Sequence, residues 1–216
     1  MDAFLSKNVL LIGETHKKEQ SFVLVKAVLD RALETHRCVA VAVEIPTDQQ
    51  EVLEAVRAGT AEINQVEIWH ALDFPPYHAF LAEMVRQSRN RPCLRIHAVD
   101  LPRAVEGDRD AWMAEQIIKI QGKDTLVIAL LGTLHVARGI RYASFSDARN
   151  VADRLEAAGS SVAILAQDWP SKCTPGLVRP STEAYAAFIN DINRIINGTV
   201  SLNERPPVDA VFNWCR

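Results

Sequence analysis

Residues 125–135 read TLVIALLGTLH, and this stretch indicates the fold most directly. Every position from 126 to 131 is apolar, so a strand formed here has no polar side to turn toward water. Such runs are typical of parallel sheets that helices cover on both faces. The run ends at Gly132, and His135 follows three positions later. The stretch therefore predicts a buried parallel strand with an ionisable side chain just beyond its carboxyl end.

The same arrangement recurs along the chain. Residues 9–16 read VLLIGETH and residues 39–44 read VAVAVE, so ionisable side chains follow each apolar run. Between the runs lie stretches with apolar residues three or four positions apart, as in helices. We predict strands at 9–12, 39–43, 94–99, 125–131, 161–166 and 208–212, and helices at 17–36, 47–59, 77–87, 108–121, 146–158 and 181–197. This alternation predicts an α/β fold with a mostly parallel central sheet and helices on both faces.

Some helix ends carry recognisable signals. Thr47 and Gln50 fit a capping box at the start of a short helix, and Gly59 fits its left-handed stop. Asp108 is expected to cap a later helix with its side chain.

Length and composition favour one ordinary globular domain. The chain has 216 residues, of which 48% are hydrophobic and 24% charged, and its net charge is −3. We expect a single domain over residues 1–216 with a helical insertion at about 63–91. No basic run indicates nucleic-acid binding, and no stretch of about 18 apolar residues predicts a membrane span. The expected partner is a small-molecule or peptide substrate, and a homodimer is possible.

The first residues and the cysteines bear on the compartment. The sequence MDAFLSKNVLLIGETH lacks the basic region and the small-residue cleavage site of a signal peptide, and it contains no lipobox. The cysteines are Cys38, Cys93, Cys173 and Cys215, and none forms a C-x-x-C pair. Because a chain of this length folds without disulfides, we expect reduced thiols and a cytoplasmic location.

Polar side chains follow five of the predicted strands. Glu14 and His16 follow the first strand, Glu44 the second, Asp100 the third, His135 the fourth, and Gln167 and Asp168 the fifth. The carboxyl ends of parallel strands meet at one edge of a sheet, and ligands bind at that edge. We therefore expect these side chains to converge on one site.

The residue types suit acid–base chemistry. Histidine titrates near neutral pH, and a neighbouring carboxylate fixes its tautomer and raises its basicity. His16 and His135 are also candidate ligands for a divalent metal ion. Two structural interpretations stay open, since Glu14 could match the positive end of a helix and His135 could be a core histidine. Glu44 directly follows five apolar residues, so its carboxylate requires a partner.

Further candidates lie on a helix start and in the helical insertion. The negative charge of Asp110 interacts favourably with the positive end of its helix dipole. Arg109, which has no such role, is then free to bind a carboxylate or phosphate in the cleft. The insertion either covers a ligand as a lid or packs as an ordinary helix. The candidate substrate-binding residues are Asp100, Asp110, His70 and Tyr77.

These motifs resemble a known superfamily. One superfamily contains ChaN-like haem-binding proteins, erythromycin-esterase-like hydrolases and TraB/Tiki proteins. Its members have a similar order of motifs to the one seen here, which is Gly13-Glu14-x-His16, then Glu44, then Arg109-Asp110-x-x-Met113-Ala114, then Gly132-x-x-His135. The resemblance covers about residues 8–140. The stretch from Trp69 through Tyr77 to Asp100-Leu101-Pro102-Arg103 looks closest to the ChaN branch.

The resemblance implies several activities. ChaN-like proteins bind haem, are linked to iron uptake and are commonly exported lipoproteins. Erythromycin-esterase-like members use a histidine and a glutamate to activate water against an ester. Tiki-like members look like metal-dependent proteases with paired Gly-x-x-His motifs, which residues 13–16 and 132–135 match.

Three functions follow as hypotheses. The first is a hydrolase for an ester or amide, in which His16 activates water and Glu14 or Glu44 orients the imidazole of His16. His135 would then act as an acid or as a second metal ligand, and Arg109 would hold a substrate anion. The second is a haem- or metal-binding protein without turnover. The third is a toxin, effector or biosynthetic accessory domain on the same scaffold.

Overall fold

Six parallel strands and one antiparallel strand form the central sheet. The computed structural model describes residues 1–35, 38–141, 149–171, 174–200 and 205–215. Neighbouring strands run parallel from β3 to β9, and β7 runs antiparallel at the edge. The predicted α/β class with a mostly parallel sheet is confirmed. The order in the sheet is β3 (Leu94–Asp100), β2 (Cys38–Pro46), β4 (Thr125–Gly132), β1 (Val9–Glu14), β6 (Val162–Asp168), β9 (Ala210–Asn213) and β7 (Gly176–Val178).

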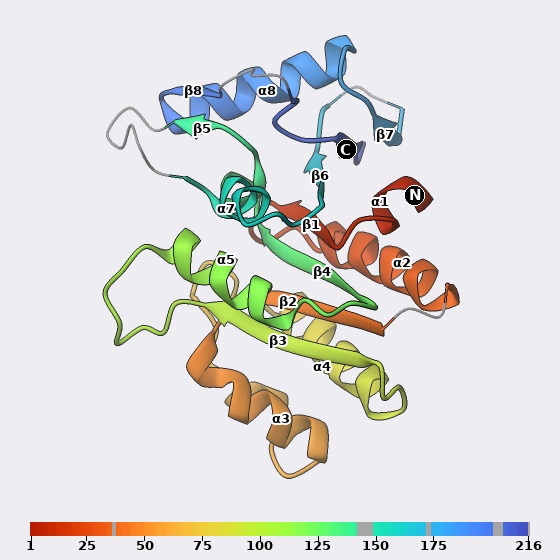
Figure 1. Cartoon of the computed structure of the whole chain (residues 1–216), viewed down its shortest axis with the longest axis vertical. Coiled ribbons are helices and arrows are strands. Elements are labelled where there is room, and N and C mark those ends of the chain that lie inside the picture. Colours follow the sequence, from red (N-terminus) through yellow and green to blue (C-terminus); the bar gives the residue numbers. More distant parts are fainter. Residues whose placement is uncertain (36–37, 142–148, 172–173, 201–204, 216) are drawn as a thin grey trace.

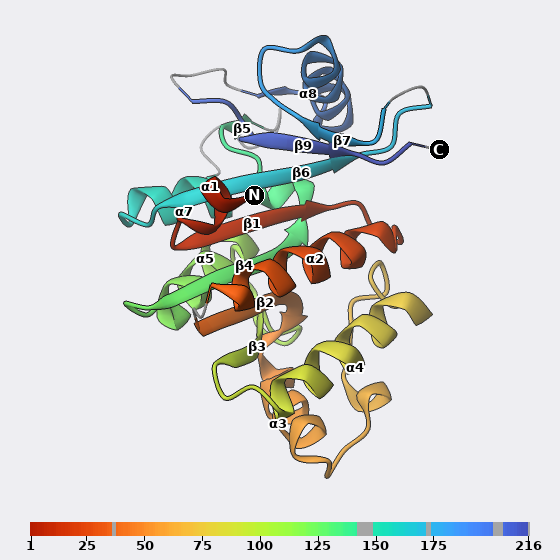
Figure 2. The same ribbon diagram turned by 90° about the vertical axis from the view of Figure 1, so that its right-hand side faces the viewer.

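Helices cover both faces of this sheet, and the layers are visible in Figure 2. One hydrophobic core contains side chains of α1 (Asp2–Leu5), α2 (Gln20–Glu34), α3 (Gln50–Ala58) and α4 (Pro75–Arg89). The other contains side chains of α5 (Arg109–Ile120), α6 (Thr133–Val136), α7 (Val151–Ala157) and α8 (Glu183–Ile196). Within β1, Leu10 and Ile12 belong to the first core, whereas Val9 and Leu11 belong to the second. Both faces of the strand are thus apolar, which explains the unbroken apolar run.

Several short elements complete the fold. Two 3₁₀ turns, η1 (Thr47–Gln49) and η2 (Ile63–Gln65), flank α3, and β5 (Ile140–Arg141) pairs antiparallel with β8 (Thr199–Val200). Figure 1 places α8, β5 and β8 at the end of the molecule opposite α3. The sequence pattern did not predict α1, α6, β5, β7 or β8, because segments of four residues or fewer are too short to show a period.

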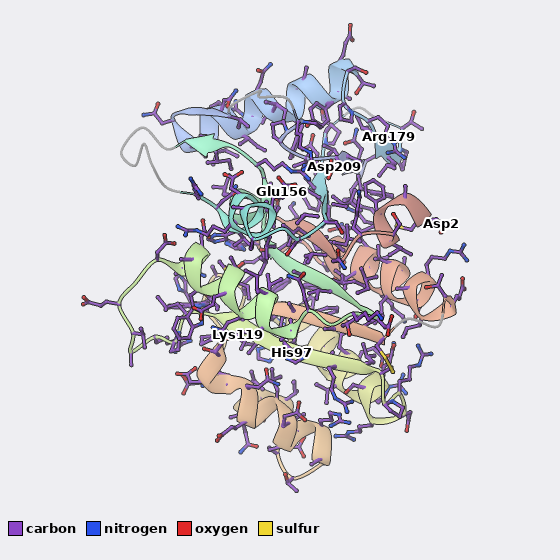
Figure 3. All side chains as sticks on the ribbon, in the orientation of Figure 1. Asp2, His97, Lys119, Glu156, Arg179 and Asp209 are labelled. Atoms are coloured by element: carbon purple, nitrogen blue, oxygen red, sulfur yellow. A yellow bond between two sulfur atoms is a disulfide. The ribbon has the colours of Figure 1, made fainter. Side chains whose placement is uncertain are left out.

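A buried arginine fixes the second helical layer against the strands. Arg138, between α6 and β5, pairs with Glu156 of α7 at 2.8 Å and with Asp209, just before β9, at 3.0 Å. Figure 3 labels both carboxylates near α7 and β6. Two carboxylates on one buried guanidinium satisfy a charge that would otherwise be costly to bury.

The helix boundaries confirm some of the predicted caps and correct one. The side chain of Asp108 accepts a hydrogen bond from the backbone of Ala111, and Gly59 ends α3 with φ +80°. The capping box predicted from Thr47 and Gln50 is wrong. Gln50 instead hydrogen-bonds Ile96 and Ala98 of β3 through its side chain, because unpaired backbone groups of the edge strand lie within its reach.

Two predicted helices differ from the observed ones at their ends. The helix predicted at 77–87 is α4, which begins at the prolines because proline suits the first helical turn. The described part of the helix predicted at 146–158 begins at Val151, where Asn150 is the N-cap. Residues 146–148 and His36, which were also predicted to be helical, lie outside the described residues.

The expectation of reduced thiols is wrong for Cys38 and Cys93, which form a disulfide. Cys38 begins β2, and Cys93 directly precedes β3. The two strands pair in parallel with Val39 opposite Leu94, so the preceding cysteines lie side by side. The bond is visible in yellow in Figure 3. Sequence spacing could not reveal the pair, because 55 positions separate the two cysteines.

Replacing both Cys38 and Cys93 with alanine is expected to lower the free energy of unfolding by about 2 to 4 kcal/mol. The bond closes a loop of 55 positions and thereby restricts the unfolded chain. Urea denaturation without reductant measures the difference. Equal urea concentrations at the unfolding midpoint of the variant and of the native protein would contradict the pairing of Cys38 with Cys93.

The described helices include no candidate membrane span, because none is both long and apolar enough to cross a bilayer.

Candidate active site

Three of the predicted side chains surround Gly132 at the carboxyl edge of the sheet. A methyl group added to Gly132 would lie 3.3 Å from Cδ2 of His135, 3.6 Å from Oε2 of Glu44 and 3.6 Å from Cε1 of His16. His135 follows β4, Glu44 lies near the end of β2 and His16 follows β1, and these strands are neighbours in the sheet. The convergence expected from parallel strands is therefore present.

Glu14 and His16 form a hydrogen-bonded pair at the end of β1. Nδ1 of His16 lies 2.5 Å from Oε1 of Glu14, whose side chain is only 4% exposed, whereas that of His16 is 47% exposed. A carboxylate only accepts, so Nδ1 carries the proton and Nε2 of the neutral imidazole keeps its lone pair. No hydrogen bond from another described residue occupies Nε2. The pair thus presents a basic nitrogen, Nε2 of His16, on an imidazole whose orientation is fixed by Glu14.

The environment raises the pKa of both members of the pair. For His16 the hydrogen bond that Nδ1 donates to Glu14 raises the pKa above its ordinary value and outweighs the opposing effect of partial burial. For Glu14 burial raises the pKa, and the bond to His16 opposes that shift only in part. The neutral imidazole therefore predominates only above the raised pKa of His16.

Titration of His16 by NMR is expected to give a pKa above 6.5, the ordinary value. The variant Glu14→Gln keeps an oxygen acceptor for Nδ1 but removes the negative charge that stabilises the imidazolium. It should therefore lower the pKa of His16. A pKa that does not respond to this change would show that Glu14 does not control the imidazole.

His135 is oriented by a second carboxylate. Its Nδ1 hydrogen-bonds Oδ1 of Asp110, and its Nε2 lies 3.8 Å from Oε1 of Glu44. Burial alone would lower the pKa of His135, but the hydrogen bond that its Nδ1 donates to Asp110 and the charge of Glu44 raise it above its ordinary value. These contacts fit the open interpretation of His135 as a satisfied core histidine as well as a role in the site, but the side chain also lines the cleft. Asp110 contacts His135 and does not line the cleft.

Glu44 is held by a backbone amide and a guanidinium. Its Oε2 accepts a hydrogen bond from the amide of Gly132 at 2.8 Å, and its Oε1 accepts one from Nη2 of Arg109 at 2.8 Å. The hydroxyl of Thr133 donates to the backbone oxygen of Glu14 at 3.0 Å and so joins the ends of β4 and β1. These bonds fix the carboxylate on the side of the site that contains His135.

Arg109, which the sequence had suggested would hold a substrate anion, binds carboxylates of the protein through two of its nitrogens. Its Nε and Nη2 bind the two oxygens of Asp100 at 3.0 and 2.6 Å, and Nη2 also binds Glu44. Asp100 is fully buried and also accepts a hydrogen bond from the indole of Trp69 at 2.5 Å. A buried carboxylate requires such partners, and this requirement determines where Arg109 points.

Trp69 lies between two guanidinium groups. The ring centroid is 5.2 Å from Arg103 and 5.4 Å from Arg109, distances typical of cation–π contacts. The helical insertion therefore contacts the site through Trp69, which supports the position of Asp100 and Arg109.

His70 and Tyr77 do not line the cleft. His70 is exposed, and Tyr77 is buried against Phe22 and Phe80 in the first core. Burial, with the nearby charges of Glu44, Glu14 and Asp100 as further contributions, raises the pKa of Tyr77 well above its ordinary value. Tyr77 thus packs beneath the carboxylates, as the packing interpretation of the insertion expects.

A cleft of about 430 Å³ opens beside these groups. Its apolar wall comes largely from α8, a helix that the sequence predicted without assigning it to the site. Gln167 is buried at the cleft and donates to the backbone oxygen of Gly13 and to Ser21, so its amide supports β1. The cleft is lined by Glu14, Thr15, His16, Gly132, Thr133, Leu134, His135, Gln167, Asp168, Phe188, Asp191, Ile192, Arg194 and Ile195.

The donor set does not fit a metal ion. Within the described ranges, no group of three or more His, Cys, Asp or Glu side chains is arranged to hold one. His16 and His135 each donate Nδ1–H to a carboxylate, which leaves only Nε2 of each imidazole as a donor, and Glu44, the carboxylate beside them, is already bound to Gly132 and Arg109. We therefore derive no step through a metal at this site.

Comparison with known proteins places the fold. No protein-family model matches the chain. No curated protein matches it either. Among solved structures, a protein from Bacillus cereus superposes with a TM-score of 0.64 at 10% identity, over 99% of this chain and 90% of that chain. ChaN of Campylobacter jejuni, described with cofacial haem binding, gives 0.53 at 13% identity, over 80% and 85%.

An effector has the same fold. The type III effector HopBA1 gives a TM-score of 0.51 at 9% identity, over 98% of this chain and 89% of that chain. At these identities the likeness concerns the fold. It confirms the ChaN-like fold that the sequence motifs indicated.

Proposed function

We propose that this chain is a hydrolase that cleaves an ester or amide bond in the cleft beside His16. The observation that carries the proposal is the orientation of the pair: Glu14 holds Nδ1 of His16, and a half-exposed imidazole lines an open cleft. Such a pair is a general base with its tautomer already fixed.

In the proposed reaction His16 takes a proton from water at Nε2 as the water oxygen attacks the carbonyl carbon. Glu14 stabilises the imidazolium that forms. The tetrahedral intermediate then collapses, the bond from carbon to the leaving oxygen or nitrogen breaks, and that atom takes a proton from Nε2 of His135. The raised pKa of His135 supports this role, because it keeps the protonated form available near neutral pH.

The structure favours one division of roles among those that the sequence left open. Glu14 orients His16, while Glu44 faces His135 and keeps the site charge-balanced. Asp110 orients His135, and Arg109 and Asp100 position Glu44. The carboxylates and the arginine thus act as positioning residues in this scheme.

A haem-binding protein without turnover is the second candidate, favoured by the exposed His16 beside an apolar wall. A haem needs an axial ligand and apolar surroundings. An imidazole whose Nδ1 is bound by a carboxylate could be that ligand, and Phe188 and Ile195 in the same cleft are apolar. The likeness of fold to ChaN is consistent with it. The effector hypothesis rests on the shared fold with HopBA1, and fold alone does not determine activity.

The disulfide bears on the compartment. Disulfides persist in oxidising compartments, so the Cys38–Cys93 bond favours such a compartment over the cytoplasmic location expected from the sequence.

One preparation distinguishes these functions. The protein is purified without a metal-affinity tag, its visible spectrum is recorded before and after titration with haem, and its metal content is measured. A series of p-nitrophenyl esters and peptide amides is assayed on the same sample. The hydrolase proposal predicts that the colourless protein turns over at least one of these esters or amides. A Soret band that is lost in His16→Ala, without turnover of any substrate, would favour haem binding, and a stoichiometric metal would contradict the scheme.

A further inference from the structure

The cleft continues from His16 onto an apolar face of α8 that the proposed chemistry does not use. Phe188, Ile192 and Ile195 lie at helical spacings of four and three, so they follow one another along one side of the helix. Leu134, next to His135, adds a further apolar side chain to the lining. The apolar wall and the candidate catalytic groups thus line one cleft.

Ile195 is unusual among the residues of this wall. Its side chain is 68% exposed, whereas Phe188 and Ile192 are buried in the second core. A large branched apolar side chain at the rim of a cleft is in contact with water, and an apolar ligand that displaces this water gains binding free energy. Phe188 and Ile192 provide a rigid base, and Ile195 provides the exposed surface above it.

Charge at the rim is balanced along this helix. Asp191 and Arg194 both line the cleft and pair with each other at 3.0 Å, so the arginine is not an uncompensated anchor for an anion. A ligand group that lies along this apolar face is therefore expected to be apolar and uncharged.

We propose that the α8 face binds the acyl chain of the substrate, so that the preferred substrates of the hydrolase are neutral esters or amides of linear aliphatic acids. Positions 188 and 195 are seven residues apart, which corresponds to about 10 Å along the helix. An extended chain of roughly eight to nine carbons covers that length. In this arrangement the carbonyl carbon lies beside His16, and the alkyl chain lies along Phe188, Ile192 and Ile195. The inference rests on the proposed hydrolase for its substrate class.

A binding experiment tests this face separately from catalysis. Methyl n-alkyl ketones from four to ten carbons carry a carbonyl and an alkyl chain but no bond that water can cleave. Their affinities are measured by ligand-observed NMR with the native protein, with Ile195→Ser and with Val23→Ser. Val23 is the matched control, because it is a β-branched residue of α2 that is 59% exposed and lines a different groove.

The expected affinity rises about fourfold for each added methylene, the usual gain for a buried CH₂, and levels off beyond roughly eight carbons. Ile195→Ser should weaken the eight-carbon ketone about fivefold, and Val23→Ser should leave it unchanged. Affinity that is independent of chain length, or an equal loss in both variants, would overturn the proposal. So would a change of oligomeric state in Ile195→Ser on size-exclusion chromatography, since a second copy of the chain would then cover this face.

The same series of chain lengths in ester substrates separates this inference from the proposed function. Length-dependent binding of ketones without turnover of any ester would refute the hydrolase and leave an acyl-binding cleft. Turnover that is indifferent to acyl length and to Ile195→Ser would refute the acyl wall and leave the hydrolase.

Discussion

The variant His16→Ala is expected to keep its fold and to lower kcat/KM for an ester by about 10²- to 10⁴-fold, the usual contribution of a general base. The fold should survive because His16 is half-exposed and lies beyond the end of β1. Its loss also leaves Glu14 buried without its imidazole partner. That carboxyl already has a raised pKa and can take up a proton, so the structural cost stays small.

His78→Ala is the matched control for this experiment. His78 is a partly exposed histidine of α4 that also binds a carboxylate, Asp73, at 2.7 Å, but it does not line the cleft. Its removal should leave kcat/KM unchanged. Circular dichroism and urea denaturation of both variants verify the fold. Near-native activity of a folded His16→Ala would refute the proposed role of the imidazole.

The variant Arg109→Leu is expected to lower the free energy of unfolding by about 3 kcal/mol. It leaves Asp100, which is fully buried, and Glu44, which is nearly so, without their cation. The cost should lie at the low end of the range for a broken buried pair, because the side chain of Arg109 is itself 38% exposed. Urea denaturation measures the loss.

Arg103→Leu is the control for Arg109→Leu. Arg103 also stacks on Trp69, but its ion pair with Glu67 is exposed on both sides. Its replacement should cost about 1 kcal/mol or less. Comparable losses in the two variants would indicate that stacking on Trp69, rather than the buried carboxylates, determines the stability of this cluster.

The sheet and the convergence of the site could be predicted from the sequence because both depend on local patterns. The apolar runs before Glu14, Glu44 and His135 specify strands that are buried on both faces, and the parallel arrangement then brings their ends together. The motif resemblance pointed to the same fold, which the comparisons confirm.

The partners within the site could not be read from the sequence. Arg109 was expected to face a substrate, yet a fully buried Asp100 holds it. Whether a strand-end carboxylate is exposed depends on the register of β2 and β3 and on the placement of Trp69, which are long-range properties. The sequence showed that Glu44 needs a partner but not which residue supplies it.

The apolar wall and the disulfide were missed for related reasons. The pattern of residues 181–197 predicted a helix, but it did not show that Phe188 and Ile195 face the cleft beside His16. Ile195, which continues the apolar side of this amphipathic helix near its C-terminal end but is exposed, was the one signal available. The disulfide depends on the pairing of β2 with β3, which brings together cysteines 55 positions apart.

The central claim is that His16, held by Glu14, is the base that activates water. The most direct test is the pH dependence of kcat/KM for the native protein and for Glu14→Gln, measured beside the NMR titration of His16. Because the neutral imidazole is the active form, kcat/KM should rise with pH through a pKa above 6.5 that coincides with that of His16. In Glu14→Gln both values should move down together. A kinetic pKa that stays in place while the titration of His16 shifts would contradict the account.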